Sequence, residues 1–161
     1  QGLITEVSST VMRQIEAESR PIRLSLLLPG KPLYVSGDPQ QLRQVFLNLF
    51  INSMDAIEGP GEITVQTLPH PQKLTLLFKD TGCGIKKEDL GRVFDPFFTT
   101  KPPGKGTGLG LSICYSIIQA HRGNIEATSD GPGRGATFKI SLPLLEAKGD
   151  GQKAKGALRR G

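Results

Sequence analysis

The chain has 161 residues and a formal net charge of +5, and 37% of its residues are hydrophobic. This length predicts one domain with a sizeable core. No apolar run reaches the ~18–20 residues of a membrane span and no secretory signal is visible, so we expect no direct membrane contact in this chain. Cys83 and Cys114 give neither a disulfide framework nor metal-ligand spacing, and a reducing, cytoplasmic location fits them best.

The positive charge is concentrated at the C-terminal end. Residues 147–161 hold five lysines and arginines against one aspartate, which accounts for +4 of the +5. The rest of the chain is nearly neutral, and this excludes an extended nucleic-acid surface. We therefore divide the chain into a domain over residues 1–146 and a basic tail over residues 147–161 that we expect to be disordered.

The hydrophobic pattern predicts alternating helices and strands. Apolar residues at helical spacing indicate helices, and alternating apolar residues indicate strands. The expected elements in chain order are a helix (3–19), a strand (22–28), an extended piece (33–36), a helix (38–57), two strands (62–68 and 73–79), a short helix (86–90), a helix (109–121) and two strands (123–128 and 137–142). The 38–57 helix has Asp38 as N-cap and Pro39 at its first position. The sum is an α+β fold, a two-layer α/β sandwich with a mixed sheet of about five strands and three main helices on one face.

The 38–57 helix carries polar residues at the border of its apolar face. At about 100° per residue, Asn48, Asn52 and Asp55 form a narrow stripe, with Ala56 beside it. Apolar residues elsewhere predict that this helix is buried on several sides, where an amide without a partner costs a few kcal/mol. Hydrogen bonds to backbone carbonyls would be enough to satisfy the side-chain amide of a single asparagine. Two asparagines four residues apart, followed by Asp55, favour a ligand or a metal.

A glycine-rich loop, Asp80-Thr-Gly82-Cys-Gly84-Ile85, follows an apolar strand. It places a carboxylate at the end of a strand, where it can accept a hydrogen bond from an exocyclic amine such as that of adenine. Gly82 and Gly84 would let the backbone turn sharply and approach a flat ligand. Alone this is a weak signal, because turns of this composition are common.

A second glycine-rich loop runs from Gly104 to Leu111 and opens a helix. Its spacing differs from that of the P-loop and of the dinucleotide fingerprint. Glycines that lead into a helix N-terminus still present N–H groups and a positive dipole end to an anion. Lys101 and Lys105 stand nearby and can reach phosphates. The irregular segment 99–106, rich in proline and glycine, indicates a lid that orders on binding.

Taken in order, these segments resemble the catalytic ATP-binding domain of bacterial sensor histidine kinases, in the wider family shared with gyrase, Hsp90 and MutL. Asn48-Leu-x-x-Asn52 is similar to the N box, Asp80-x-Gly82-x-Gly84 to the G1 box, Phe94-Asp-Pro-Phe-Phe98 to the F box, and Gly106-Thr-Gly-Leu-Gly-Leu111 to the G2 box. The resemblance covers roughly residues 3–145. Residues 97–101 further resemble kinases of the nitrogen-regulation and dicarboxylate-sensing type.

The resemblance implies a Bergerat-type sandwich that binds ATP and Mg²⁺, and it assigns roles to residues. Asp80 would bind the adenine amino group, supported through water by Thr137, and Asn52 would ligate Mg²⁺. Asn48 would lie on the phosphate side. The complete set expected around the nucleotide is Asn48, Asn52, Asp55, Ala56, Asp80, Gly82, Gly84, Ile85, Lys101, Lys105, Gly106, Thr107, Gly108, Leu109, Gly110, Leu111 and Thr137.

The resemblance alone does not separate a kinase from an ATP hydrolase. In gyrase-like relatives a glutamate general base lies four residues before the metal-binding asparagine, and here that position is Asn48. An amide cannot take a proton from water near neutral pH, whereas a neutral imidazole attacks a phosphate through its free lone pair. Positioning and charge neutralisation then supply most of the catalysis. We therefore expect a protein-histidine kinase with Asn48 and Lys101 as catalytic residues.

The phosphoacceptor is not expected in this chain. His70 precedes a proline and His121 precedes an arginine, and neither matches an acceptor histidine, which an acidic residue usually follows. We expect an isolated, monomeric catalytic domain whose partner is the histidine-bearing dimerisation domain of the same kinase and, indirectly, a response regulator. Three alternatives stay open, namely an ATP-hydrolysing relative, a serine kinase of the anti-sigma type and a non-catalytic nucleotide-sensing module.

Overall fold

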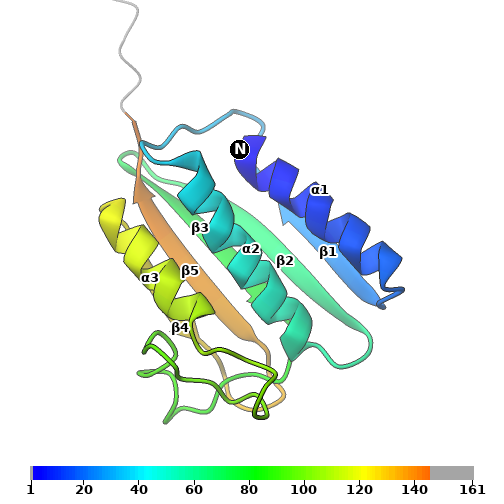
Figure 1. Cartoon of the computed structure of the whole chain (residues 1–161). Coiled ribbons are helices and arrows are strands. Elements are labelled where there is room, and N and C mark those ends of the chain that lie inside the picture. The colour runs from blue at the N-terminus through cyan, green and yellow to red at the C-terminus, as the bar shows by residue number, and fades with distance from the viewer. Residues whose placement is uncertain (1, 146–161) are drawn as a thin grey trace, which may run out of the picture.

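The computed structural model describes residues 2–145, so the tail expected over residues 147–161 lies outside the described residues. The elements in chain order are α1 (Gly2–Ala17), β1 (Ile22–Leu27), α2 (Pro39–Ala56), β2 (Gly61–Pro69), β3 (Lys73–Asp80), α3 (Gly110–Ala120), β4 (Asn124–Thr128) and β5 (Ala136–Pro143). The strands form one five-stranded sheet in the order β1-β2-β3-β5-β4 (Figure 1). β1 and β2 are parallel and the other pairs are antiparallel.

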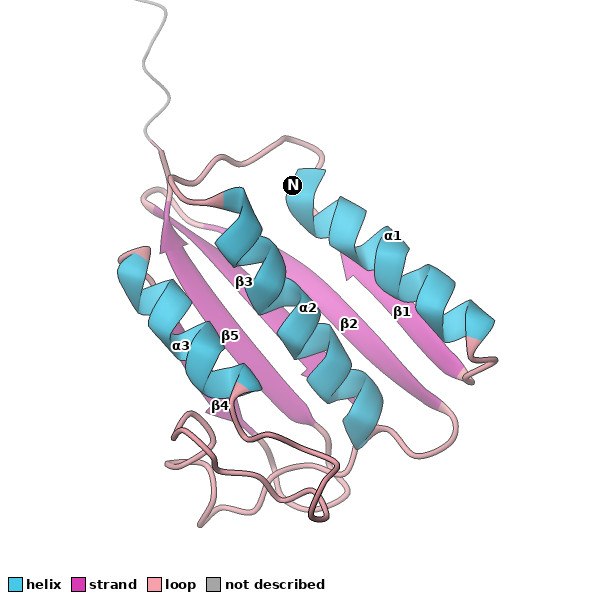
Figure 2. Ribbon diagram, in the orientation of Figure 1, coloured by secondary structure: helices cyan, strands magenta, loops and turns pink. Residues whose placement is uncertain are grey.

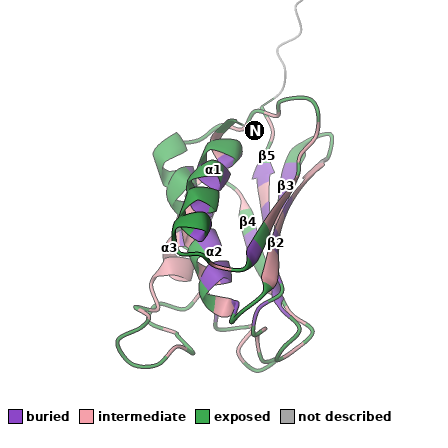
Figure 3. Cartoon of the chain, turned by 90° about the vertical axis from the view of Figure 1, so that its right-hand side faces the viewer, coloured by how far each residue is buried: buried purple, intermediate pink, exposed green. Residues whose placement is uncertain are grey.

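The molecule has two layers. The three helices lie side by side on one face of the sheet (Figure 2). A view from the side shows the buried residues gathered between the helix layer and the sheet layer (Figure 3). Phe78 of β3 is fully buried at the centre, where its ring stacks on Phe46 at 5.9 Å and meets Phe50 edge-on at 5.3 Å between ring centroids. This arrangement confirms the two-layer α/β sandwich with a mixed sheet that the sequence predicts.

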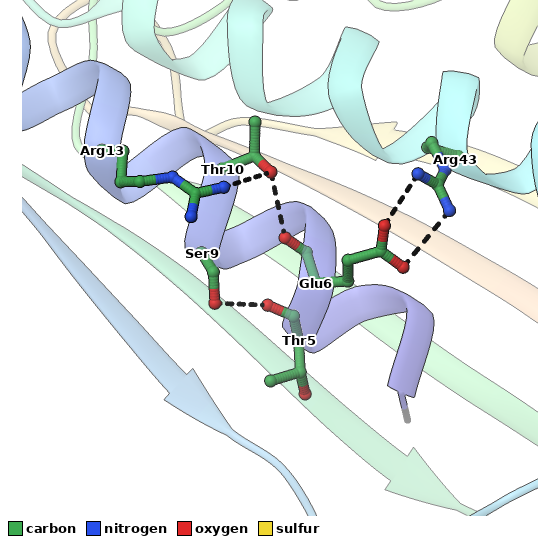
Figure 4. Close-up of polar contacts among 6 residues, drawn as sticks. All are labelled: Thr5, Glu6, Ser9, Thr10, Arg13 and Arg43. Atoms are coloured by element: carbon green, nitrogen blue, oxygen red, sulfur yellow. Dashed lines mark hydrogen bonds and ion pairs between the residues drawn. The ribbon is translucent and has the colours of Figure 1, made fainter.

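α1 is held to α2 chiefly by apolar packing. Its buried face consists of Ile4, Val7, Ser8, Val11 and Ile15. Arg43 of α2 forms a two-bond ion pair with Glu6 of α1, at 2.8 and 3.2 Å (Figure 4). Both side chains are exposed, so this pair adds little stability. The hydroxyl of Ser8 is buried and has no hydrogen-bond partner among the described residues.

The ends of α2 and α3 agree with the sequence signals. The Asp38 carboxylate caps α2 by accepting a hydrogen bond from the Gln40 N–H at 2.8 Å, and Pro39 begins the helix. His121, just after α3, accepts the Asp38 N–H through Nε2 at 3.0 Å and contacts the Ile117 carbonyl through Nδ1 at 2.7 Å. This histidine therefore fastens the end of α3 to the beginning of α2.

One expected element is wrong. Residues 86–90 form no helix but belong to consecutive turns, with hydrogen bonds from Asp89 to Lys86, Arg92 to Asp89 and Asp95 to Arg92. Each bond spans three residues, so no ladder of four-residue bonds develops, and Val93 is the buried residue of this segment. α2 packs against α1 and α3 as well as against the sheet, so it is buried on several sides as expected, and Ile51, which is 45% exposed, lies on its remaining side.

Within residues 2–145 no helix combines the length and apolarity that a bilayer span requires. Residues 99–109 have no regular secondary structure, as their proline and glycine content predicts.

Candidate functional site

Two adjoining cavities lie at one end of the sandwich, where α2 ends, α3 begins and the long loops gather (Figure 1). The first, which we call the Asp80 cavity, measures about 620 Å³. The second, which we call the Gly106 cavity, measures about 490 Å³. They share four lining residues, Asn52, Asp55, Lys101 and Lys105, so they form one continuous cleft. Each volume lies within the range of small-molecule sites.

Asp80 is the buried charge of the Asp80 cavity. It ends β3 and is 2% exposed. Its Oδ1 accepts the N–H of Gly82 at 2.9 Å and the N–H of Ala136 at 3.2 Å. Its Oδ2 accepts only the Ser53 hydroxyl, at 3.4 Å. Loss of water raises the pKa of Asp80, and the hydrogen bonds from Gly82, Ala136 and Ser53 counter only part of this rise.

The wall beside Asp80 is apolar and is built by backbone packing. Ala56 and Ile85, both in the set expected around the nucleotide, line the Asp80 cavity. The Cys83 N–H donates to the Ala56 carbonyl at 2.8 Å, so the loop after β3 lies against the end of α2. Gly82 is not among the residues that line either cavity. A Cβ there would stand 2.6 Å from the Ala56 carbonyl oxygen.

Gly84 does line the Asp80 cavity and has a φ of +72°. A Cβ on it would collide with the Gly131 carbonyl. The two glycines of this loop were expected to make room for a flat ligand. In the structure they allow backbone to pack on backbone, which fixes the loop that carries Asp80.

Thr137 is not placed beside Asp80. Asp80 pairs with Ala136 across β3 and β5, and Ala136 and Phe138 line the cavity. Side chains alternate along a strand, so Thr137 points to the other face of the sheet, where it pairs with Lys79. Its position argues against the water-mediated role expected for it. The alternation of apolar and polar residues over Ala136-Thr-Phe-Lys-Ile140 is the sequence signal that could have shown this.

The Gly106 cavity contains the asparagines and the second glycine loop. Asn48 donates from Nδ2 to the Gly110 carbonyl at 3.2 Å, so a backbone carbonyl meets this amide. The Asn52 side chain has no hydrogen bond to any described residue, and Asn52 lines both cavities. The polar stripe on α2 is therefore divided, because Asn48 fixes the start of α3 whereas Asn52 faces the cleft.

Gly106, Thr107, Gly108, Gly110 and Leu111 line the Gly106 cavity, as expected. Leu109 does not, since it is the N-cap residue of α3 and its N–H is bound to the Thr107 hydroxyl at 3.3 Å. Gly108 has a φ of +67° and lies against the backbone of Phe97, whose N–H donates to the Gly108 carbonyl at 2.9 Å. This contact joins the F-box segment to the second glycine loop.

Lys101 and Asp55 form an ion pair of 2.6 Å, where the two cavities meet. Lys105 lines both cavities and has no ion pair within residues 2–145. Lys101 and Lys105 at the junction and the N-terminus of α3 therefore supply positive potential to the Gly106 cavity.

Several lining residues were not among the sequence candidates. Around the Asp80 cavity these are Glu58, Cys83, Thr100, Pro102, Ala136 and Phe138. Around the Gly106 cavity they are Ile51, Phe98, Thr99 and Gly104. Most are immediate neighbours of a motif, and motif spacing alone does not show which neighbours turn inward.

The cleft thus has an apolar slot with a buried carboxylate at one end and amide and cationic groups at the other. Residues 37–146 match the family described as Histidine kinase-, DNA gyrase B-, and HSP90-like ATPase. The chain belongs to this family. An ATP-binding site therefore agrees with the geometry, and the fold is the Bergerat α/β fold of histidine kinase catalytic domains.

Similar proteins are sensor kinases. The signal transduction histidine-protein kinase AtoS of Escherichia coli (strain K12) is 43% identical over 68% of this chain and 18% of its own length. Sporulation kinase A of Bacillus subtilis (strain 168) is 38% identical over 88% of this chain and 22% of its own length. The chain thus spans less than a quarter of either relative.

Solved structures agree with this relationship. The catalytic domain of histidine kinase ThkA is 31% identical with a TM-score of 0.77, over 88% of this chain and 92% of that one. The mycobacterial sensor histidine kinase MprB is 25% identical with a TM-score of 0.78, over 89% of this chain and 94% of that one. These values bear out the sensor-kinase resemblance. The narrower likeness to nitrogen-regulation kinases stays a prediction.

Proposed function

We propose that this chain binds Mg-ATP in the cleft and transfers the γ-phosphoryl group to a histidine of a dimerisation domain, as the catalytic unit of a two-component sensor kinase. The observation that carries the proposal is the buried carboxylate of Asp80, which shares one continuous cleft with Asn52 and two lysines. An apolar slot with one acceptor suits a purine, and a basic end suits phosphates.

The residues present fit the base and the phosphates. Asp80 keeps Oδ2 for an exocyclic amine, because Oδ1 already accepts two backbone N–H groups. Ala56 and Ile85 supply the apolar walls. Lys101, Lys105 and the first turn of α3 supply the charge and the N–H donors that phosphates need.

The residues also fit Mg²⁺. Within residues 2–145 no group of three or more histidines, cysteines or carboxylates forms a metal cage of its own. Mg²⁺ is ordinarily held by one or two protein oxygens together with substrate phosphates. Asn52 has a free amide oxygen at the junction of the two cavities, with Asp55 one turn further along α2. When bound, Mg²⁺ neutralises charge on the transferring phosphoryl group.

Transfer is favoured over hydrolysis by Asn48. Its amide is held by the Gly110 carbonyl and has no basic atom for a water proton. A histidine acceptor needs no such base, because the neutral ring nitrogen carries its own lone pair. Asn48 therefore positions the phosphate end of the cleft, and Lys101 stabilises the developing charge.

The acceptor histidine has to come from another domain. Both ring nitrogens of His121 are engaged by backbone groups. His70 lies in the β2–β3 turn, at the opposite end of β3 from Asp80. At ~3.4 Å per strand residue, that separation is about 24 Å. The ThkA structure solved in complex with the response regulator TrrA supports a response regulator as the later partner. The cytoplasmic location, the monomeric state and the boundary at residue 146 stay predictions.

The test is a transfer assay with γ-labelled MgATP and a purified histidine-helix domain. We expect the label to move to that domain with little free phosphate, and Asp80→Asn to abolish transfer at low nucleotide concentration. Free phosphate released without an acceptor would favour the hydrolase instead. Label on a serine of a small partner would favour the anti-sigma type. Nucleotide binding with no transfer to any histidine domain would favour a sensing module.

A further inference from the structure

The end of α2 is one wall of the cleft. Its last turn and the residues that follow contribute four lining residues, Asn52, Asp55, Ala56 and Glu58. The final carbonyls of a helix have no partners within the helix, so the position of this turn depends on what binds them from outside. The Ile57 N–H gives only one bond, to the Met54 carbonyl at 3.3 Å.

Arg20 supplies the missing donors. Its Nη2 donates to the Met54 carbonyl at 2.8 Å and to the Ile57 carbonyl at 2.9 Å. The side chain is half-buried, and none of the ion pairs found within residues 2–145 includes it. A guanidinium at the negative end of a helix forms charge-assisted hydrogen bonds that a neutral side chain does not.

The backbone of Arg20 is itself fixed by the end of α1. Its N–H donates to the Ile15 carbonyl at 3.0 Å, and the preceding Ser19, with a φ of 50°, donates to the Glu16 carbonyl at 3.0 Å. This is a helix-terminating turn of the Schellman type. Pro21 follows at once and restricts the backbone further. The guanidinium therefore projects from a rigid base.

The other side of the α2 end carries the loop of Asp80. The Ala56 carbonyl accepts the Cys83 N–H at 2.8 Å, and the Gly82 N–H donates to Asp80 Oδ1 at 2.9 Å. Arg20 holds the carbonyls of Met54 and Ile57, which lie on either side of Ala56 in the chain. Hydrogen bonds and the short stretches of backbone between them thus link Arg20 through the α2 end to Asp80.

We infer that Arg20 is a positioning residue for nucleotide binding, which couples the end of α1 to the adenine end of the cleft. This inference rests on the proposed function. It assigns Arg20 no contact with nucleotide. Its effect is transmitted through the α2 end, which sets the distance between the Ala56 wall and the Asp80 carboxylate.

The test compares three full-length variants. Arg20→Met keeps the apolar stem but removes both donors, and Arg20→Lys keeps the cation. Val11→Ala is the matched control, because Val11 is a buried residue of α1 that lines neither cavity. Two quantities are measured at a temperature where every variant is folded, namely the Kd of Mg-ADP by calorimetry and hydrogen exchange of the Cys83 amide without nucleotide.

Arg20→Met should weaken Mg-ADP binding about fivefold or more, the size expected for coupling between neighbouring sites. It should also speed exchange of the Cys83 amide, and Arg20→Lys should restore part of both. Val11→Ala should lower the melting temperature and change neither quantity. If Arg20→Met does not fold, Arg20→Lys is the deciding variant. One ammonium does not reproduce the planar contact of the guanidinium with two carbonyls, so this variant should still differ from wild type in both quantities. Unchanged Kd and unchanged exchange in the Arg20 variants would overturn the inference. The exchange measurement needs no nucleotide, so it stays decisive even if the wild-type chain binds none.

Discussion

Exchange of Asp80 for asparagine changes one hydrogen-bonding atom in a side chain that is 2% exposed. Oδ1 faces the N–H groups of Gly82 and Ala136, so the amide oxygen has to take that place. The amide NH₂ group then takes the place of Oδ2, next to the Ser53 hydroxyl and the cavity. An acceptor aimed at the adenine amine is thereby replaced by a donor.

The expected loss follows from the energy of one charged hydrogen bond. Such a bond contributes ~1.5–3 kcal/mol. Since ~1.4 kcal/mol is tenfold in Kd, Asp80→Asn should weaken Mg-ADP binding by about tenfold to a hundredfold. Calorimetric titration of both proteins measures this directly, and Ser53→Ala serves as a control that leaves the carboxylate in place. An unchanged Kd in Asp80→Asn would refute the assignment of Asp80 to the purine.

The same exchange has an opposite effect on stability. Burial raises the pKa of Asp80, so the folded chain retains this proton at pH values where the unfolded chain has lost it. The stability contribution therefore falls as the pH rises from the ordinary aspartate range through the raised folded pKa, and it stays lower above it. Asparagine has no such cost. Asp80→Asn should melt at an equal or higher temperature than wild type at pH 7, and the difference should shrink in acid. A large drop in melting temperature at neutral pH would instead make Asp80 a structural residue.

Three further outcomes are expected. Asn52→Asp should change the Mg²⁺ concentration needed for nucleotide binding more than it changes the affinity for ADP without Mg²⁺, as measured by a Mg²⁺ titration at fixed ADP. Equal changes in both quantities would contradict a metal-binding role for Asn52. Cys83 is exposed in the Asp80 cavity and should react with iodoacetamide more slowly when nucleotide is bound. Burial raises the pKa of Cys114 to about 12 and should protect this thiol until the chain unfolds. Mass spectrometry can follow the alkylation of both cysteines. Ser8→Ala should raise the free energy of unfolding in urea by ~1 kcal/mol, because it removes a buried hydroxyl that has no partner; a loss of stability would indicate an undetected bond.

The sequence predicts the bounds of helices and strands well where the residues that determine them are close together in the chain. Asp38 and Pro39 placed the start of α2, and alternation placed every strand to within a residue or two. The cleft was predictable too, because Asp80, Asn52 and the second glycine loop sit at element ends that one layered fold brings together. Even the prediction for Asn48 was half right, since a backbone carbonyl meets its amide while the residue still lines the cleft.

Features that depend on contacts between distant segments were missed. Nothing near Arg20 in the sequence indicates that its guanidinium binds carbonyls 34 and 37 residues away. Gly82 and Gly84 were assigned to a ligand because their partners, the Ala56 and Gly131 backbones, come close only in the folded chain. Thr137 was misplaced for another reason. A motif does not give the strand register, which pairs Asp80 with Ala136 and Thr137 with Lys79.

The ion pair between Lys101 and Asp55 suits the proposed phosphoryl transfer. Both side chains are partly exposed, so the pair adds little to the stability of the fold. Both groups nevertheless belong to the set expected around the nucleotide. A triphosphate would offer Lys101 a more strongly charged partner than Asp55, and Mg²⁺ would offer Asp55 a cation in exchange. Each side chain can then change partners and still have an opposite charge beside it. Asn48 meanwhile holds the start of α3 through the Gly110 carbonyl. In the proposed reaction Lys101 can therefore exchange partners while Asn48 keeps the start of α3 in place.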